Sequence, residues 1–154
     1  MLVKTKHFGE IELDEDKIIT FDKGIFGFEE CKKFTLLYDE KDGYRPSISW
    51  FQSIDLQELA LPVISPELVI EKYNPIVNDD MLESLGDIND NNIVILLTLT
   101  VPSDLTKMTT NLKAPIIINS DIKRGSQLVA ENDDYMIKYP VYDKFINMEK
   151  KGEM

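Results

Sequence analysis

The segment FDKGIFGFEE, residues 21–30, places two glycines three positions apart among phenylalanines and charged side chains. Glycine-rich turns of this kind surround phosphates in nucleotide-binding proteins, where backbone N–H groups point at the anion. Gly24 and Gly27 do not form a Gly-x-Gly-x-x-Gly pattern, and no Gly-Lys-Ser/Thr sequence follows them. We therefore predict a bend in which these glycines permit positive φ or close backbone approach.

The aromatic residues of this bend have two alternative roles. In the first, some fill the core while Phe26 and Phe28 remain outside as contact residues, since aromatic side chains are favoured at protein interfaces. In the second, the segment is a glycine-kinked corner of a barrel and most of these side chains only pack. The sequence leaves both readings open.

Residues suited to catalysis or metal binding are few. His7 is the only histidine and Cys31 the only cysteine, and no Gly-x-Ser-x-Gly motif is present. This set does not support a catalytic triad or a zinc site, so we expect a surface histidine and a semi-buried structural thiol. The segment from Asp87 to Asn92 begins like a calcium loop, but Asn92 replaces the glycine and Thr98 the bidentate glutamate. An Asn/Asp-rich turn is predicted there instead.

The remaining carboxylates give no sign of a hydrolase. The adjacent acidic pairs lie in polar, turn-like stretches, whereas a glycosidase needs one carboxyl in an apolar setting. The sequence therefore predicts a protein that is not an enzyme and that has no cofactor and no metal ion.

Charge limits the class of partner. The 154 residues include 28 acidic and 17 basic side chains, which gives a net charge of −11. This balance disfavours direct nucleic-acid binding and favours a basic protein partner, although charge can also serve solubility alone. The longest apolar run is Ile93 to Leu97, and the first residues lack the apolar core of a signal peptide. We expect a cytoplasmic, monomeric protein without a membrane anchor.

Short segments with period-two alternation dominate the chain, as in antiparallel strands with one inward face. The turn pairs Asp42-Gly43 and Arg124-Gly125 read as tight connections. The fold class predicted is all-β: one antiparallel, barrel-like domain over residues 1–154 with one or two short helices. The alternating segments are Glu10 to Leu13, Phe34 to Tyr38, Ile48 to Trp50 and Leu97 to Val101.

Prolines and caps refine this prediction. Runs that contain Pro62 or Pro115 should be edge strands or begin there, because proline cannot donate to a ladder. Asn78 to Gly86 is the best helix candidate, with an Asn or Asp cap at its start and a glycine at its end. Residues from Lys144 to Lys151 read as a frayed helix or tail, which extends to about residue 154.

Several ordered blocks resemble the FliW family of flagellar assembly factors. The resemblance begins with Thr5-Lys6 and Gly9-x-Ile11-x-Leu13 and includes the bend Phe21-x-x-Gly24-Ile25-x-Gly27-Phe28-Glu29-Glu30. It continues through Phe51 to Asp55, Leu61-Pro62-Val63 and Thr110 to Asn119, and then Gly125-x-Gln127-Leu128-Val129, Tyr135 and Pro140. One departure is Lys138, which stands where the family often has arginine before the late proline.

The resemblance implies a β-barrel protein that switches between two partners. Proteins similar to this one bind the terminal helical segments of flagellin before export. When flagellin leaves, they bind the carbon storage regulator, an RNA-binding translational repressor, and antagonise it. Flagellin translation is thereby coupled to secretion. The alternative function is a small-ligand-binding β-barrel, which would need a deep apolar pocket with a few inward polar groups.

Two surfaces are candidates for these contacts. The run from Pro66 to Pro75 is predicted to be an edge strand that offers backbone groups and Glu67, Glu71 and Tyr73 to a basic partner. The alternative is an ordinary barrel strand with solvated glutamates. For flagellin, the candidates are Phe26 and Phe28, or the face from Asn111 to Pro115. Asn111 and Gln127 could instead satisfy buried backbone groups.

Overall fold

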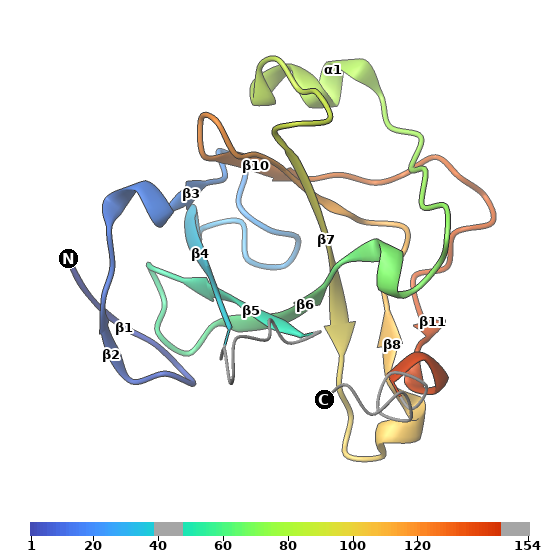
Figure 1. Ribbon diagram of the computed structural model, residues 1–154, viewed down its shortest axis with the longest axis horizontal. Helices are drawn as coiled ribbons and strands as arrows, with labels where there is room; N and C mark the ends of the chain where they lie inside the picture. The colour runs from blue at the N-terminus through green and yellow to red at the C-terminus, as the bar shows by residue number, and fades with distance from the viewer. Residues whose placement is uncertain (39–47, 146–154) are drawn as a thin grey trace.

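The computed structural model describes residues 1–38 and 48–145, and seven strands of this part of the chain close into a barrel (Figure 1). Neighbouring strands run β7-β6-β5-β4-β3-β10-β9, and β9 pairs with β7 to close the ring. These pairs are antiparallel except β3–β10, which meets in parallel at Thr20 and Arg124. The all-β, barrel-like prediction is confirmed. The strands are β3 (Ile19–Thr20), β4 (Lys33–Leu37), β5 (Ser49–Ser53), β6 (Ala60–Ile64), β7 (Ile93–Thr100), β9 (Ile116–Asn119) and β10 (Arg124–Gln127).

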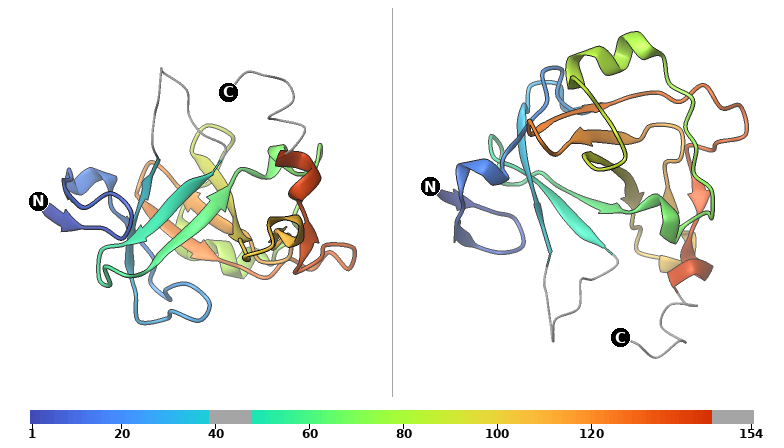
Figure 2. Two further views of the ribbon diagram at one scale, coloured as in Figure 1. Left: turned by 90° about the horizontal axis from the view of Figure 1, so that it is seen from below. Right: turned by 45° about the horizontal axis from the view of Figure 1, so that its top comes forward.

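Smaller elements extend the barrel at its two sides. The hairpin of β1 (Leu2–Lys4) and β2 (Glu10–Glu12) lies at one side, and β8 (Thr109–Thr110) with β11 (Tyr139–Pro140) lies at the other (Figure 2). The helix α1 spans Asp79–Leu82, and residues 142–145 are also helical. Four 3₁₀ turns complete the described elements: η1 (Glu15–Lys17), η2 (Pro66–Leu68), η3 (Glu83–Leu85) and η4 (Leu105–Lys107).

Aromatic side chains fill the interior of the barrel. The rings of Phe34 and Phe51 stack 4.9 Å apart, and the ring of Phe21 meets both edge-on. All three side chains are fully buried. A Cβ atom at Gly125 would lie 2.5 Å from the ring of Phe21, so only glycine fits beside this ring. Because these residues occupy the lumen, the deep apolar pocket of a ligand-binding barrel is not seen in the part that the structure describes.

Two further apolar clusters cover the outside of β7 and β9. One surrounds Leu97 and Leu99 and includes Val69 and Val141, while the other joins Leu85 to Ile117 and Leu128. Within β7, Leu97 and Leu99 are buried and Thr100 is exposed, as the alternation predicts. Because both faces of β9 are covered, all four of its residues are buried and its alternation disappears.

The predicted helix is confirmed with its caps. The side chain of Asn78 accepts a hydrogen bond from the N–H of Asp80, and α1 is followed directly by η3. The segment ends at Gly86, whose φ of 69° lies in the left-handed region that favours glycine. Among the described residues, no helix has the length and apolar character needed to cross a membrane.

Four local predictions need correction or lie outside the described residues. Arg124 and Gly125 are not a tight connection, because they begin β10 and the turn precedes them at residues 120–123. Asp42-Gly43 lies outside the described residues, as does most of the predicted tail from Lys144 to Lys151. In β5, Ser49 is buried and Trp50 is half-buried, the reverse of the expected pattern. The ring of Trp50 instead packs at a tilt against exposed His7 in the β1–β2 turn, with 4.0 Å between the ring centroids.

Of the two predictions made from prolines in apolar runs, one is confirmed and one is not. Pro115 directly precedes β9, as predicted. The prediction for Pro62 is wrong, because Pro62 lies inside β6, a central strand that β5 and β7 flank. However, β6 pairs with β7 only through Val63 and Ile64, so the missing N–H of Pro62 falls outside that ladder.

Candidate protein-binding surfaces

The bend at residues 21–30 divides its apolar side chains between core and surface. Phe21 and Ile25 are buried in the barrel, whereas Phe26 is 49% exposed and Phe28 39% exposed. Gly24 has φ of 68°, and a Cβ atom there would lie 2.6 Å from the carbonyl oxygen of Glu29. The bend predicted from the two glycines is therefore confirmed, and it holds two phenylalanine rings outside the core.

Gln127 of β10 fixes the position of this bend. Its side-chain oxygen accepts a hydrogen bond from the N–H of Phe26 at 2.9 Å, and its Nε2 donates to the carbonyl of Ala114 at 3.1 Å. The prediction that Gln127 satisfies buried backbone groups is confirmed. Phe26 is thus presented on a rigid support rather than on a free loop.

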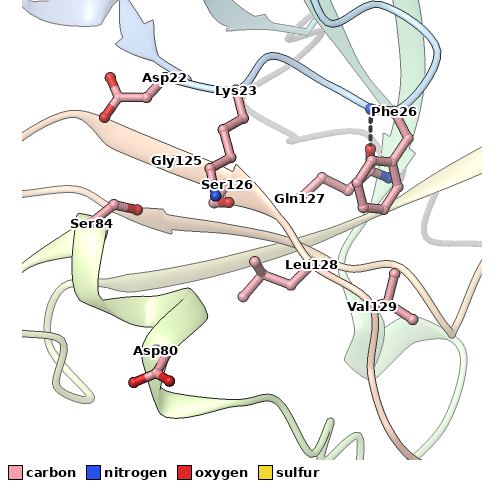
Figure 3. Close-up of a pocket in the computed structure, with 10 residues that line it drawn as sticks. All are labelled: Asp22, Lys23, Phe26, Asp80, Ser84, Gly125, Ser126, Gln127, Leu128 and Val129. Carbon is pink, nitrogen blue, oxygen red and sulfur yellow. Dashed lines mark hydrogen bonds between the residues drawn. The ribbon is translucent and has the colours of Figure 1, made fainter.

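A groove of about 290 Å³ opens beside Phe26, between the bend and α1 (Figure 3). Figure 3 shows Phe26 on one side, Asp80 of α1 on the other, and Leu128 and Val129 between them. We call this the Phe26 groove. Its lining residues are Asp22, Lys23, Phe26, Asp80, Ser84 and the run from Gly125 to Val129.

The Phe26 groove combines an apolar floor with a mixed-charge rim. Val129 is 47% exposed and adds to the apolar area of Phe26. Asp22 pairs with Arg124 at 2.8 Å, which leaves Lys23 and Asp80 without an ion pair in the described structure. An apolar floor with a polar rim suits an amphipathic helix. Sequence reasoning missed Leu128 and Val129 as groove residues, although the run after Gly125 is part of the family pattern.

The predicted edge strand from Pro66 to Pro75 is wrong. Residues 66–68 form the 3₁₀ turn η2, and the N–H groups of Val69 and Ile70 both donate to the carbonyl of Pro66. Proline at the first position favours such a turn because its φ is already fixed near the helical value. Val69 is 2% exposed and packs in the cluster around Leu97, so the segment folds onto the barrel wall.

Three of the residues predicted in that segment nevertheless line one groove. Glu67, Glu71 and Tyr73 lie around a groove of about 330 Å³ whose other side is formed by Ile93 and Ile95 of β7. We call this the acidic groove; Pro66 and Lys72 complete its lining. Sequence reasoning missed Ile93 and Ile95, whose membership depends on where the chain leaves the sheet after β6.

Tyr73 ties the acidic groove to the rest of the molecule. Its hydroxyl donates to the carbonyl of Leu112 at 2.7 Å, and its ring stacks on Tyr135 with centroids 5.1 Å apart. The hydroxyl of Tyr135 accepts in turn from the N–H of Asn74. Burial, together with the neighbouring Tyr135, raises the pKa of Tyr73 well above the ordinary tyrosine value. Tyr73 therefore holds the groove wall in place.

Asn111 and Pro115 lie apart from these contact surfaces. The side-chain oxygen of Asn111 accepts from the N–H groups of Lys113 and Ala114, so it satisfies backbone groups as the alternative predicted. Pro115 is buried. Neither residue lines the Phe26 groove or the acidic groove.

The other polar candidates have structural roles. Asn92 is buried, and it accepts from the N–H of Asn89 and donates to the carbonyl of Asp87, which closes the Asn/Asp-rich turn. Within residues 1–38 and 48–145, no group of three His, Cys, Asp or Glu side chains is placed to hold a metal ion. Cys31 is buried in the barrel core, more deeply than the semi-buried structural thiol that we expected.

Comparison with known proteins gives one consistent result. The family described as FliW protein matches residues 2–141. The chain belongs to the FliW family. The flagellar assembly factor FliW of Lachnoclostridium phytofermentans is 62% identical over 153 residues, which are 99% of this chain and 98% of that protein. The FliW of Thermotoga neapolitana is 40% identical over 140 residues, 90% of this chain and 91% of the relative.

A solved structure supports the same family and fold. The crystal structure of a flagellar assembly factor FliW superposes with a TM-score of 0.82 at 31% sequence identity. The match covers 92% of this chain and 96% of that one. A role in flagellar assembly follows from this family membership, and the barrel seen here is the FliW fold.

Proposed function

We propose that this FliW protein is a non-enzymatic partner switch in the cytoplasm. It binds flagellin before export and, when free, binds and antagonises the carbon storage regulator, so that flagellin translation follows secretion. The observation that carries the proposal is the full-length match to proteins named flagellar assembly factor. The two grooves supply surfaces of different chemistry for two different partners.

The Phe26 groove suits the terminal helical segments of flagellin. Its apolar floor and polar rim match the two faces of an amphipathic helix. Phe26 is half-exposed yet anchored through its backbone to Gln127, so binding would cost little ordering entropy. Large aromatic side chains held in this way commonly dominate binding energy.

The acidic groove suits the repressor, which must display positive charge to hold RNA phosphates. Among the described residues, two ion pairs are present, one at the N-terminus and one at Arg124, so most carboxylates remain available to a basic partner. One charge pair at contact distance near a surface is worth about 4 kcal/mol before salt screening. A coupling of about 1.4 kcal/mol would already weaken RNA binding tenfold.

A titration of the purified chain against each purified partner tests this function. We expect saturable binding of full-length flagellin and of the repressor, and loss of RNA affinity when the chain is added to a repressor–RNA complex. Failure to bind either partner would refute the proposal. Undiminished RNA affinity at low salt in a complex of all three would refute the antagonism.

Charge reversal then tests the assignment of the acidic groove. Glu71→Lys should weaken repressor binding, and the loss should shrink as salt rises because exposed charges are screened. Glu58→Lys is the matched control, because Glu58 is exposed in the β5–β6 connection and lines neither groove. Equal affinities for the two variants would exclude this groove as the repressor site.

A further inference from the structure

At the start of β7, from Ile93 to Ile95, one edge of the strand is unpaired, and the acidic groove lies beside it. The N–H of Ser120 donates to the carbonyl of Asn92, and the N–H of Asn111 donates to the carbonyl of Thr98. In an antiparallel ladder, hydrogen-bonded and non-bonded positions alternate. The even-numbered residues of β7 therefore direct their backbone groups towards β9 and β8, and the odd-numbered residues direct theirs towards β6.

The β6 side of this edge is left open by η2. β6 pairs with β7 only at Leu97 and Thr98, and the chain then turns away at Pro66 (Figure 1). The N–H of Ile93 donates a hydrogen bond to the carbonyl of Asn89 in the preceding turn. The carbonyl of Ile93 and both backbone groups of Ile95 have no hydrogen-bond partner in the part of the chain that the structure describes.

The lining of the acidic groove selects the kind of segment that could pair with this edge. The groove is lined by Ile93 and Ile95 of β7 and, from the segment that follows β6, by Glu67 and Glu71 with a single lysine, Lys72. A helix placed here would leave the β7 backbone groups unpaired, whereas an extended segment would pair with them. Its alternate side chains would point to the acidic rim, where lysine or arginine is favoured.

We infer that the acidic groove binds an extended, basic segment of the repressor, which adds a short strand to the open edge of β7. This inference rests on the proposed function for the identity of the partner. The edge predicted at Pro66–Pro75 was wrong, but the edge of β7 inferred here is unpaired because that same segment does not continue β6. Strand addition provides affinity through backbone hydrogen bonds, and the glutamates provide selectivity for a basic sequence.

Amide hydrogen exchange of the whole chain, followed by NMR with and without saturating repressor, tests the inference directly. The amide of Ile95 should exchange fast in the free protein and at least about tenfold more slowly in the complex. The amide of Val94 is the internal control, because it faces β9, is already paired there and should be protected in both states. Exchange at Ile95 uses the unaltered protein, so folding of a variant is not at issue.

The outcomes separate this inference from the proposed function. If the repressor binds and exchange at Ile95 is unchanged, strand addition is wrong while the switch function stands. If flagellin rather than the repressor protects Ile95, the assignment of the partner is wrong. If the repressor fails to bind at all, the proposed function itself fails. In the double variant Glu67→Lys/Glu71→Lys, repressor affinity should fall at least about tenfold relative to Glu58→Lys; an equal affinity would overturn the role of the rim.

Discussion

The N–H of Phe26 donates to the side-chain oxygen of Gln127 at 2.9 Å, across 101 positions of sequence. The same glutamine donates to the buried carbonyl of Ala114, so one side chain joins the aromatic bend to β10 and to the start of β9. Gln127→Ala leaves both backbone groups without this partner. We expect unfolding free energy to fall by about 1–3 kcal/mol, measured by urea denaturation. Ser126→Ala, half-buried and next in the strand, should change it by less than about 0.5 kcal/mol.

The exposed rings of the bend should affect binding without affecting stability. Phe26→Ala removes an aromatic side chain that is 49% exposed, and Phe28→Ala removes one that is 39% exposed. We expect flagellin affinity, measured by calorimetry, to fall by at least about 1 kcal/mol for Phe26→Ala and by less for Phe28→Ala, which does not line the groove. Unfolding free energy should stay within about 0.5 kcal/mol of the parent.

Ile137→Ala is the control for these two variants. Ile137 is 63% exposed and lies outside the Phe26 groove, so its loss tests whether any exposed apolar side chain matters. Flagellin affinity reduced equally by Phe26→Ala and Ile137→Ala would count against a specific site at the bend.

The elements that the sequence predicted correctly are those that depend on interactions between residues close together in the chain. In β7, alternation of leucine and threonine reports a strand with different surroundings on its two faces, and Leu97 and Leu99 are buried accordingly. Asn78 and Gly86 identify the helix ends because capping needs only neighbouring backbone groups. The glycine bend was predictable for the same reason, whereas the division of its aromatic side chains between core and surface was one of two readings that the sequence left open.

The predictions that were wrong concern features that depend on contacts between segments far apart in the sequence. Trp50 was expected to face the core, but the barrel core lies on one side of β5 and the N-terminal hairpin covers the other, where Gln52 accepts from the N–H of Lys6. The run after Pro66 alternates like a strand, yet Val69 packs on the outer face of β7 and the chain leaves the sheet. Ile93 and Ile95 became groove residues only through that departure, which no local pattern in β7 reports.

Gly125 should be required by packing with Phe21 rather than by backbone conformation. Because an added Cβ would lie 2.5 Å from the ring, Gly125→Ala forces the core to shift, and unfolding free energy should fall by about 1–3 kcal/mol. Phe21→Leu removes the atoms that clash, so Gly125→Ala should cost less in that background than in the parent. Urea denaturation of the four proteins gives the coupling; an unchanged cost in both backgrounds would place the strain elsewhere.

Tyr73 should make stability depend on alkaline pH in a specific way. Below pH 10 its hydroxyl is neutral in the folded and unfolded states, and the hydrogen bond to Leu112 contributes in full. Above pH 10 the unfolded chain loses this proton, whereas the folded protein retains it because burial and Tyr135 raise the pKa of Tyr73. The folded state then binds more protons, so its stability falls as pH rises. Tyr73→Phe removes this component as well as the hydrogen bond.

The expected result is a stability difference between Tyr73→Phe and the parent that becomes smaller as the pH rises. At pH 7, Tyr73→Phe should be less stable than the parent by about 0.5–1.5 kcal/mol, the usual net value of one hydrogen bond. Between about pH 10 and pH 11 the parent should lose stability faster than the variant, since only the parent carries the shifted tyrosine. Tyr142→Phe is the control, because the Tyr142 hydroxyl has no hydrogen bond within the described structure and its removal should cost little stability at pH 7. Urea denaturation at each pH gives the profiles, and parallel curves for Tyr73→Phe and the parent would show that the Tyr73 hydroxyl is not protected in the folded state.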